Sequence, residues 1–141
     1  MDPEERLWFL EMAVTAYLAD PTDNGDLAFA DLSNAHQYVW LLHRKGAVHM
    51  EVGAREFSVQ HPLAARAVSR LHELEFERRS IDSDFARDGL AANPAELSWL
   101  VEQLFLGAYE VRPDFVVKAS FKNEHAARRL RSMIRIAASG C

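Results

Sequence analysis

The stretch WLLHRKGAVHMEVGAREF, Trp40 to Phe57, decides the fold because it reads as two strands around a tight turn. Large apolar residues recur at every second position on both sides of the turn, as in strands that bury one face. A three-residue turn at Arg44-Lys45-Gly46 places glycine in the left-handed position that such turns need. This register predicts three facing pairs on the buried side: Tyr38 with Val52, Trp40 with Met50, and Leu42 with Val48.

The second face of the predicted hairpin would carry a mixed set of side chains: Val39, Leu41, His43, His49 and Phe57. A contiguous apolar patch on a sheet is typical of a protein–protein surface. A strand pair that is apolar on both faces also fits burial on both sides, under a helix or under the loop at Ala19 to Asp26. Both interpretations stay open at the level of sequence.

The rest of the chain predicts helices from their caps and strands from alternation. Asp2-Pro3-Glu4-Glu5 and Asn93-Pro94-Ala95-Glu96 each combine a cap residue, a proline at the first helical position and a glutamate in register. Other expected elements are a helical turn or strand start at Leu27–Asn34, a helix from Pro62, strands at Phe76–Ala86 and Phe115–Phe121, and a helix after Asn123. This order predicts one α+β domain over residues 1–141, an antiparallel sheet with helices packed against it.

Composition favours a globular, mildly acidic protein. The 141 residues include 16 Lys+Arg and 21 Asp+Glu, which gives a net charge of -5 and argues against a nucleic-acid partner. No run approaches the roughly 18 apolar residues of a membrane span, so no membrane partner is expected. The opening MDPEER lacks the basic start of a secretory signal, and we expect a cytoplasmic location.

Two histidines flank the turn and raise the question of a metal site. In the predicted register His43 and His49 share one face, and Glu51 is the only evident local addition. Zinc needs three or four protein ligands, so solvated strand histidines are the better interpretation and no metal or cofactor is expected. The single cysteine, Cys141, excludes an internal disulfide.

Motifs for catalysis are missing. No serine stands in a G-x-S-x-G elbow, and the six glycines form no phosphate-binding loop. Asp82 and Asp84 would share one face of a strand, where they fit acid–base work or an exposed polar edge. We therefore expect a protein that is not an enzyme, and no catalytic residue is assigned.

The last helix is the most basic part of the acidic chain. Its arginines are Arg128, Arg129, Arg131 and Arg135. They fit a docking face for an acidic partner or subunit, or a solvated helix face. Arginine near a helix C-terminus is also favoured by the helix dipole.

The central block resembles a known family. It comprises YVWLLHRKGAVHMEVGAREF, LAARAVSRLHELEF, DSDFARDG, PAELSWLVEQLFLGAYEV and PDFVVKASF. The strand pair ending in EVG, the helix leading into a Leu-x-x-Leu-x-Phe step and the capped helix before a final strand are similar to TY-Chap domains. These are the type III secretion chaperone-like and YbjN-like domains. The resemblance implies a small acidic chaperone-like domain, frequently a homodimer, that binds a partner polypeptide along sheet and groove surfaces without cofactor or catalysis.

Together these observations favour a non-enzymatic polypeptide-binding protein of secretion-chaperone-like type. Its partner would be a client, an effector or a toxin. The expected partner-binding residues are those of the second hairpin face, with the arginines of the last helix as a second surface. Two alternatives stay open: a toxin-neutralising immunity or inhibitor protein, and a small enzyme with an unrecognised acid/base site.

Overall fold

The computed structural model describes residues 1–19, 25–53, 62–78, 80 and 83–139. Within them the elements follow the order α1 (Pro3–Leu18), β1 (Asp26–Asp31), β2 (Asn34–Arg44), β3 (Ala47–Val52), α2 (Pro62–Glu73), β4 (Phe85–Ala91), α3 (Pro94–Gln103), a π-helical segment (Leu104–Ala108), β5 (Val117–Phe121) and α4 (Glu124–Ser139). The segment Leu27–Asn34, left open by the sequence, mostly forms strand β1.

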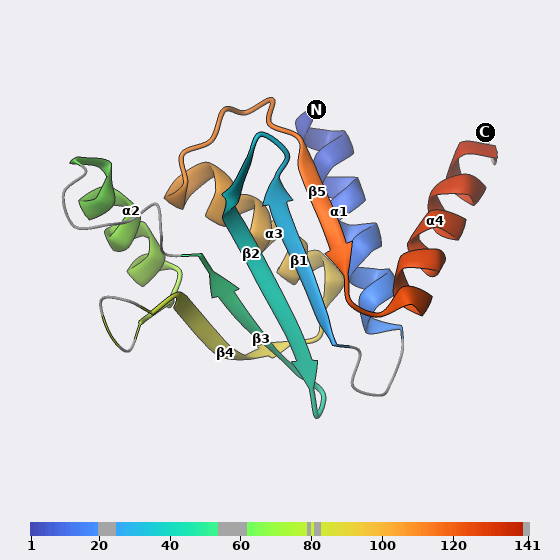
Figure 1. Cartoon of the computed structure of the whole chain (residues 1–141), viewed down its shortest axis with the longest axis horizontal. Helices are drawn as coiled ribbons and strands as arrows, with labels where there is room; N and C mark the ends of the chain where they lie inside the picture. Colours follow the sequence, from blue (N-terminus) through green and yellow to red (C-terminus); the bar gives the residue numbers. More distant parts are fainter. Residues whose placement is uncertain (20–24, 54–61, 79, 81–82, 140–141) are drawn as a thin grey trace.

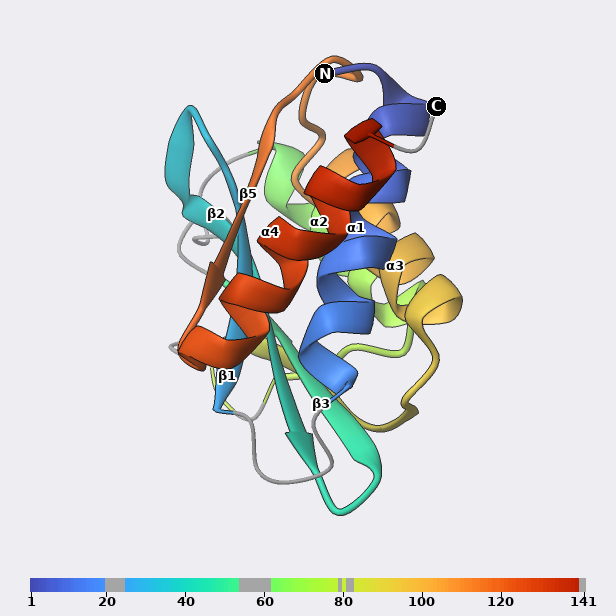
Figure 2. The same cartoon turned by 90° about the vertical axis from the view of Figure 1, so that its right-hand side faces the viewer.

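The five strands form one antiparallel sheet in the order β4-β3-β2-β1-β5. The helices lie on one side of this sheet, so the fold has two layers (Figures 1 and 2). The predicted α+β class, an antiparallel sheet with helices packed against it, is confirmed. Among the helices that the structure describes, none combines the length and apolar composition that crossing a bilayer requires.

The hairpin between β2 and β3 turns in two residues, so the predicted three-residue turn was wrong. Arg44 pairs with Ala47, and the turn residues Lys45 and Gly46 have φ angles of 51° and 79°. Two central residues at positive φ give a turn whose twist matches that of the flanking strands. The observed pairs differ from the predicted ones by one residue, and such a shift moves every side chain of a strand to the other face.

The register brings Val39 and Leu41 into the core, where both are fully buried. One row of side chains crosses all five strands beneath the helices: Ala119, Phe29, Val39, Val52 and Phe85. The prediction that Val39 and Leu41 form an accessible partner-binding face is therefore wrong. Helices of the same chain cover them.

Both predicted helix caps are confirmed, and helices also begin at Pro62 and Glu124 as expected. The Asp2 carboxylate accepts from the Glu5 amide, and the Asn93 side chain accepts from the Glu96 amide. The strand predicted at Phe76–Ala86 is wrong for most of its described residues: Glu77 forms an isolated bridge with Ala86, and the strand that the structure describes is Phe85–Ala91. In α4 the buried residues are Ala126 and Leu130, whereas the end of the helix from Arg135 to Ser139 is exposed.

A charged residue lies at the centre of the helical layer. Arg6 of α1 is fully buried, and its Nε donates to both carboxylate oxygens of Glu102 in α3, at 3.0 and 2.9 Å. Its Nη1 donates to the carbonyls of Pro113 and Phe115, at 2.9 and 3.2 Å. This single side chain therefore ties α1, α3 and the segment before β5 together.

Candidate functional site

The side of the sheet away from the helices carries the candidate site, and we call it the outer face. It is formed by Ala28, Ala30, Tyr38, Trp40, Leu42, Ala47, His49, Glu51 and Ala86. One row of it, across all five strands, reads Ser120, Ala28, Trp40, Glu51 and Ala86. Trp40 and Leu42 are partly exposed there. The described helices lie on the other side of the sheet (Figure 2). The outer face therefore carries partly exposed aromatic and aliphatic side chains together with His49 and Glu51.

A hollow of about 510 Å³ opens on the outer face beside Trp40, and we call it the Trp40 hollow. It is lined by Trp40, Leu42, Arg44, Ala47, His49, Glu51 and Asp88. Strands β2, β3 and β4 each contribute to it. The hollow thus joins an indole ring, an imidazole and two carboxylates on one surface.

His49 lies between the two carboxylates of the hollow. Its Nε2 is 3.4 Å from Glu51 Oε1, and its Nδ1 is 3.5 Å from Asp88 Oδ1. The Trp40 ring stands nearly perpendicular to the imidazole, with 6.0 Å between the ring centres. Both contacts to oxygen are longer than the roughly 2.8 Å of a charge-assisted hydrogen bond, so the histidine is a weak partner for these carboxylates.

A β-bulge positions Asp88. Arg87 pairs with Met50 and Leu90 with Val48, so Asp88 and Gly89 together stand opposite the single residue His49. Gly89 adopts φ +69°, and its amide donates to Asp88 Oδ1 at 2.9 Å. A bulge re-aims the side chain next to it, which explains how Asp88 comes within reach of His49.

Tyr38 forms the other end of the outer face. Its hydroxyl donates to Asp84 Oδ2 at 2.7 Å, and its ring covers Gly53, where an added Cβ would meet the ring at 2.5 Å. The Tyr109 hydroxyl lies 3.0 Å from the carbonyl oxygen of Tyr38 and 2.7 Å from that of Gly53 and shares its one proton between them, which links β2 to the residue after β3. Burial, the hydrogen bond to Asp84, and the charges of Asp84 and Glu51 raise the pKa of Tyr38 to about 12.

Because the pKa of Tyr38 is raised, the free energy of unfolding should fall at alkaline pH. In the unfolded chain a tyrosine ionises near pH 10, so the contribution of Tyr38 is fully present below pH 10 and is lost as the pH rises toward 12. Because Tyr38 is only partly buried, solvent screening limits the effect to about 1 kcal/mol. Urea unfolding at pH 9 and at pH 11.5 measures it. We expect the chain to lose about 1 kcal/mol more than its Tyr38→Phe variant, whereas equal losses would contradict this.

The two histidines of the hairpin lie on opposite sides of the sheet. His43 is on the helical side, where its amide donates to the Tyr17 hydroxyl at 2.8 Å, and His49 is on the outer face. The interpretation that they share a face was wrong because it depended on the three-residue turn. Within the described residues, no three His, Cys, Asp or Glu side chains gather as metal ligands.

Three residues considered in the sequence analysis fall outside the described part of the chain: Phe57, Asp82 and Cys141. Asp84, the second member of the predicted carboxylate pair, accepts the hydrogen bond from Tyr38. Asp84 is therefore the one member of that pair that the structure describes.

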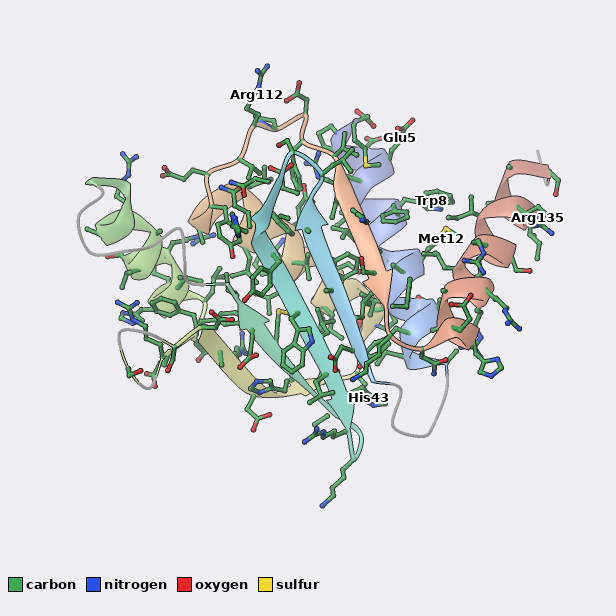
Figure 3. All side chains as sticks on the ribbon, viewed as in Figure 1. Glu5, Trp8, Met12, His43, Arg112 and Arg135 are labelled. Carbon is green, nitrogen blue, oxygen red and sulfur yellow. The ribbon has the colours of Figure 1, made fainter. Side chains whose placement is uncertain are left out.

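The arginines of α4 are distributed around the helix. Arg129 Nη1 donates to the carbonyl of Ala16 in α1 at 2.8 Å, and Arg131 lies 3.4 Å from Glu124 of its own helix. Arg128 and Arg135 are exposed, and Arg135 lies near the C-terminal end of α4, away from the sheet (Figure 3). These arginines thus serve two structural contacts and form no single basic patch over the sheet.

Two further surfaces expose tryptophan. Trp8 and Met12 of α1 point toward α4 (Figure 3), and Trp8 is 48% exposed. Trp99 of α3 is 52% exposed and lines a hollow of about 390 Å³ beside strand β4. The three tryptophans of the chain therefore mark three different surfaces, of which only that of Trp40 belongs to the sheet.

The outer-face residues Tyr38, Trp40 and Leu42 were predicted to lie in the core. Tyr38, Trp40 and Leu42 alternate as clearly as Val39 and Leu41, so alternation alone does not separate the two faces. The turn could have separated the two faces, because a two-residue turn at Lys45-Gly46 places Leu41 opposite Met50. Asp88 carried no comparable signal, since a bulge in β4 brings it to the site.

Comparison with models of protein families, with curated proteins and with solved structures finds no match for this chain.

Proposed function

We propose that this chain is a non-enzymatic, cytoplasmic polypeptide-binding protein of secretion-chaperone-like type, and that it holds an extended segment of its partner on the outer face of the sheet. The observation that carries the proposal is the outer face itself. Tyr38, Trp40 and Leu42 lie in line on β2, on the side of the sheet that the described helices leave open. An apolar sheet surface of this kind is typical of protein–protein contact.

Contact across the face is favoured over pairing at the nearest edge. Strand β4 is an edge of the sheet, and at Ala86 its free side already pairs with Glu77 through hydrogen bonds of 3.0 and 2.7 Å. Adding a partner strand at that point would require breaking this bridge. An extended segment lying over β2 needs no such change, because side chains two residues apart on it match the spacing of Tyr38, Trp40 and Leu42.

The family resemblance supports the same function. TY-Chap domains bind partner polypeptides, and the two-layer α+β arrangement agrees with what that resemblance implies. Tryptophan is the residue type that most often dominates an interface, and Trp40 lies centrally on the outer face, between Ala28 and Glu51. We infer that Trp40 supplies the largest share of the binding energy.

Binding to a permanently unfolded polypeptide tests this function. Reduced, carboxamidomethylated lysozyme labelled with fluorescein serves as the probe, and native lysozyme is the folded control. We expect the unfolded form to bind and Trp40→Ala to weaken its binding by at least about tenfold. Trp99→Ala, which removes an exposed tryptophan on α3, is the matched control and should change affinity by less than about twofold.

Two outcomes would contradict the proposal. Equal affinity of Trp40→Ala and the unchanged chain would show that the outer face takes no part. If the chain binds no unfolded probe but forms a tight complex with one folded enzyme, it acts as an immunity protein. Urea unfolding of each variant confirms that the substitution leaves the fold intact.

A further inference from the structure

The two carboxylates of the Trp40 hollow differ from the other paired carboxylates of the chain. In the described residues, every ion pair except those of His49 joins an aspartate or glutamate to an arginine. Among the described residues, the ion-pair partner of both Glu51 and Asp88 is His49, at 3.4 and 3.5 Å. Arg44 lines the same hollow, yet it makes no ion pair with either carboxylate. The two carboxylates of the hollow are therefore paired with His49, which carries a full positive charge only when it is protonated.

Carboxylates also lie at the two ends of the outer face. Asp26 pairs with Leu42 at one end of the face, and Asp84 accepts from Tyr38 at the other. Among the described residues, the basic side chains on this face include Arg44, Lys118 and Lys122, whose amide donates to the carbonyl of Asp26. Of the carboxylates on this face, Glu51 and Asp88 line the Trp40 hollow, so negative charge lies beside the Trp40 ring.

An aromatic ring next to carboxylates is a favourable environment for a guanidinium group. Arginine forms planar, paired hydrogen bonds with carboxylates and also packs on indole rings, whereas lysine does this less well. Glu51 is the direct cross-strand neighbour of Trp40, so a cation bound to its carboxylate would also contact the ring. Leu42, two residues from Trp40 on the same face, would contact an apolar side chain two residues away on an extended partner.

We propose that the outer face selects basic polypeptide segments, and that the Trp40 hollow receives an arginine side chain of the partner beside the Trp40 ring, within reach of the Glu51 and Asp88 carboxylates on either side of His49. This proposal rests on the proposed polypeptide-binding function and assigns the chemistry of the partner. The preferred segment is extended and carries an arginine with an apolar residue two positions away. Charge complementarity supplies the selection, and the apolar contacts of Trp40 and Leu42 supply the surface.

The side chain of arginine alone tests the proposal. The probe is N-acetylarginine amide, and N-acetylcitrulline amide is its control because it has nearly the same shape without the charge. The three tryptophans give three indole N–H signals in a nitrogen-15 NMR spectrum, assigned with the variants Trp8→Phe, Trp40→Phe and Trp99→Phe. We expect the Trp40 signal to shift and saturate at millimolar arginine probe, with the other two signals unchanged.

A charge-matched pair of variants shows whether the two carboxylates are responsible. Glu51→Gln with Asp88→Asn should weaken binding of the arginine probe by about fivefold or more. Glu4→Gln with Glu11→Gln removes the same two charges from exposed positions of α1 and should leave the affinity within about twofold.

Three results would overturn the arginine proposal. They are an unmoved Trp40 signal, an equal response to the citrulline probe, and equal weakening by both double variants. The binding of unfolded lysozyme separates this failure from failure of the proposed function. If the binding of unfolded lysozyme depends on Trp40 but does not change with Glu51→Gln and Asp88→Asn, polypeptide binding stands and the arginine preference is ruled out.

Discussion

Replacing Arg6 by methionine should lower the free energy of unfolding by about 3–5 kcal/mol. Arg6 is fully buried, and its guanidinium neutralises Glu102, whose side chain is 9% exposed. The same group lies over the Phe115 ring at 4.1 Å and binds the carbonyls of Pro113 and Phe115. Methionine fills much of the space but leaves the Glu102 carboxylate buried without a counter-charge. Urea unfolding followed by circular dichroism measures the loss.

Two controls separate the buried charge from a general effect of losing an arginine. Arg66→Met removes the partner of Glu110, an exposed pair with an N–O distance of 3.2 Å, and should cost less than about 1 kcal/mol. Arg6→Met combined with Glu102→Leu should recover most of the lost stability, because no charge is then left unpaired. A single Arg6→Met variant as stable as Arg66→Met would show that Glu102 is not held in a dry core.

Leu41→Ala should lower the free energy of unfolding by about 2–5 kcal/mol, whereas Leu42→Ala should cost less than about 1 kcal/mol. The two leucines are adjacent in the chain and lie on opposite faces of β2. Leu41 is fully buried under the helices, and Leu42 lines the Trp40 hollow. Removing Leu41 leaves a cavity in the core, while removing Leu42 only enlarges a surface hollow. Thermal and urea unfolding of the two variants compare them directly.

The opposite order of stabilities would contradict the two-residue turn. In the three-residue register Leu42 faces Val48 in the core and Leu41 faces outward, so the two costs would be exchanged. Equal, large losses for both variants would mean that both faces of β2 are buried, which would remove the outer face as a binding surface.

Much of the fold could be predicted because it depends on local chemistry. The caps at Asp2 and Asn93 and the buried stripe of α3 follow from residues within a few positions of one another. The alternation that ends in Phe121 placed β5 for the same reason. The buried face of the hairpin was predicted wrongly because the run Val39 to Leu42 is apolar at every position, so both registers bury an apolar set. The choice depended on Lys45, which adopts the positive φ usually taken by glycine or asparagine.

The candidate site was harder to predict because it depends on contacts between distant residues. Asp88 reaches His49 only through a bulge in a strand that was expected earlier in the chain. Asp84 meets Tyr38 across 46 positions, and Arg6 meets Glu102 across 96 positions. No local pattern in the sequence marks such pairs. The arginines of the last helix were visible in the sequence, but their contacts with Ala16 and Glu124 depend on the packing of α4.

One measurement tests most directly whether the outer face holds a polypeptide. The three indole N–H signals report separately on the outer face (Trp40), on the side of α1 toward α4 (Trp8) and on the α3 hollow (Trp99). The nitrogen-15 labelled chain is titrated with unlabelled, carboxamidomethylated lysozyme. We expect the Trp40 signal to shift or broaden first, together with the amides of Tyr38, Leu42 and Glu51, while Trp8 and Trp99 stay unchanged. A response at Trp8 or Trp99 with an unchanged Trp40 signal would contradict binding at the outer face.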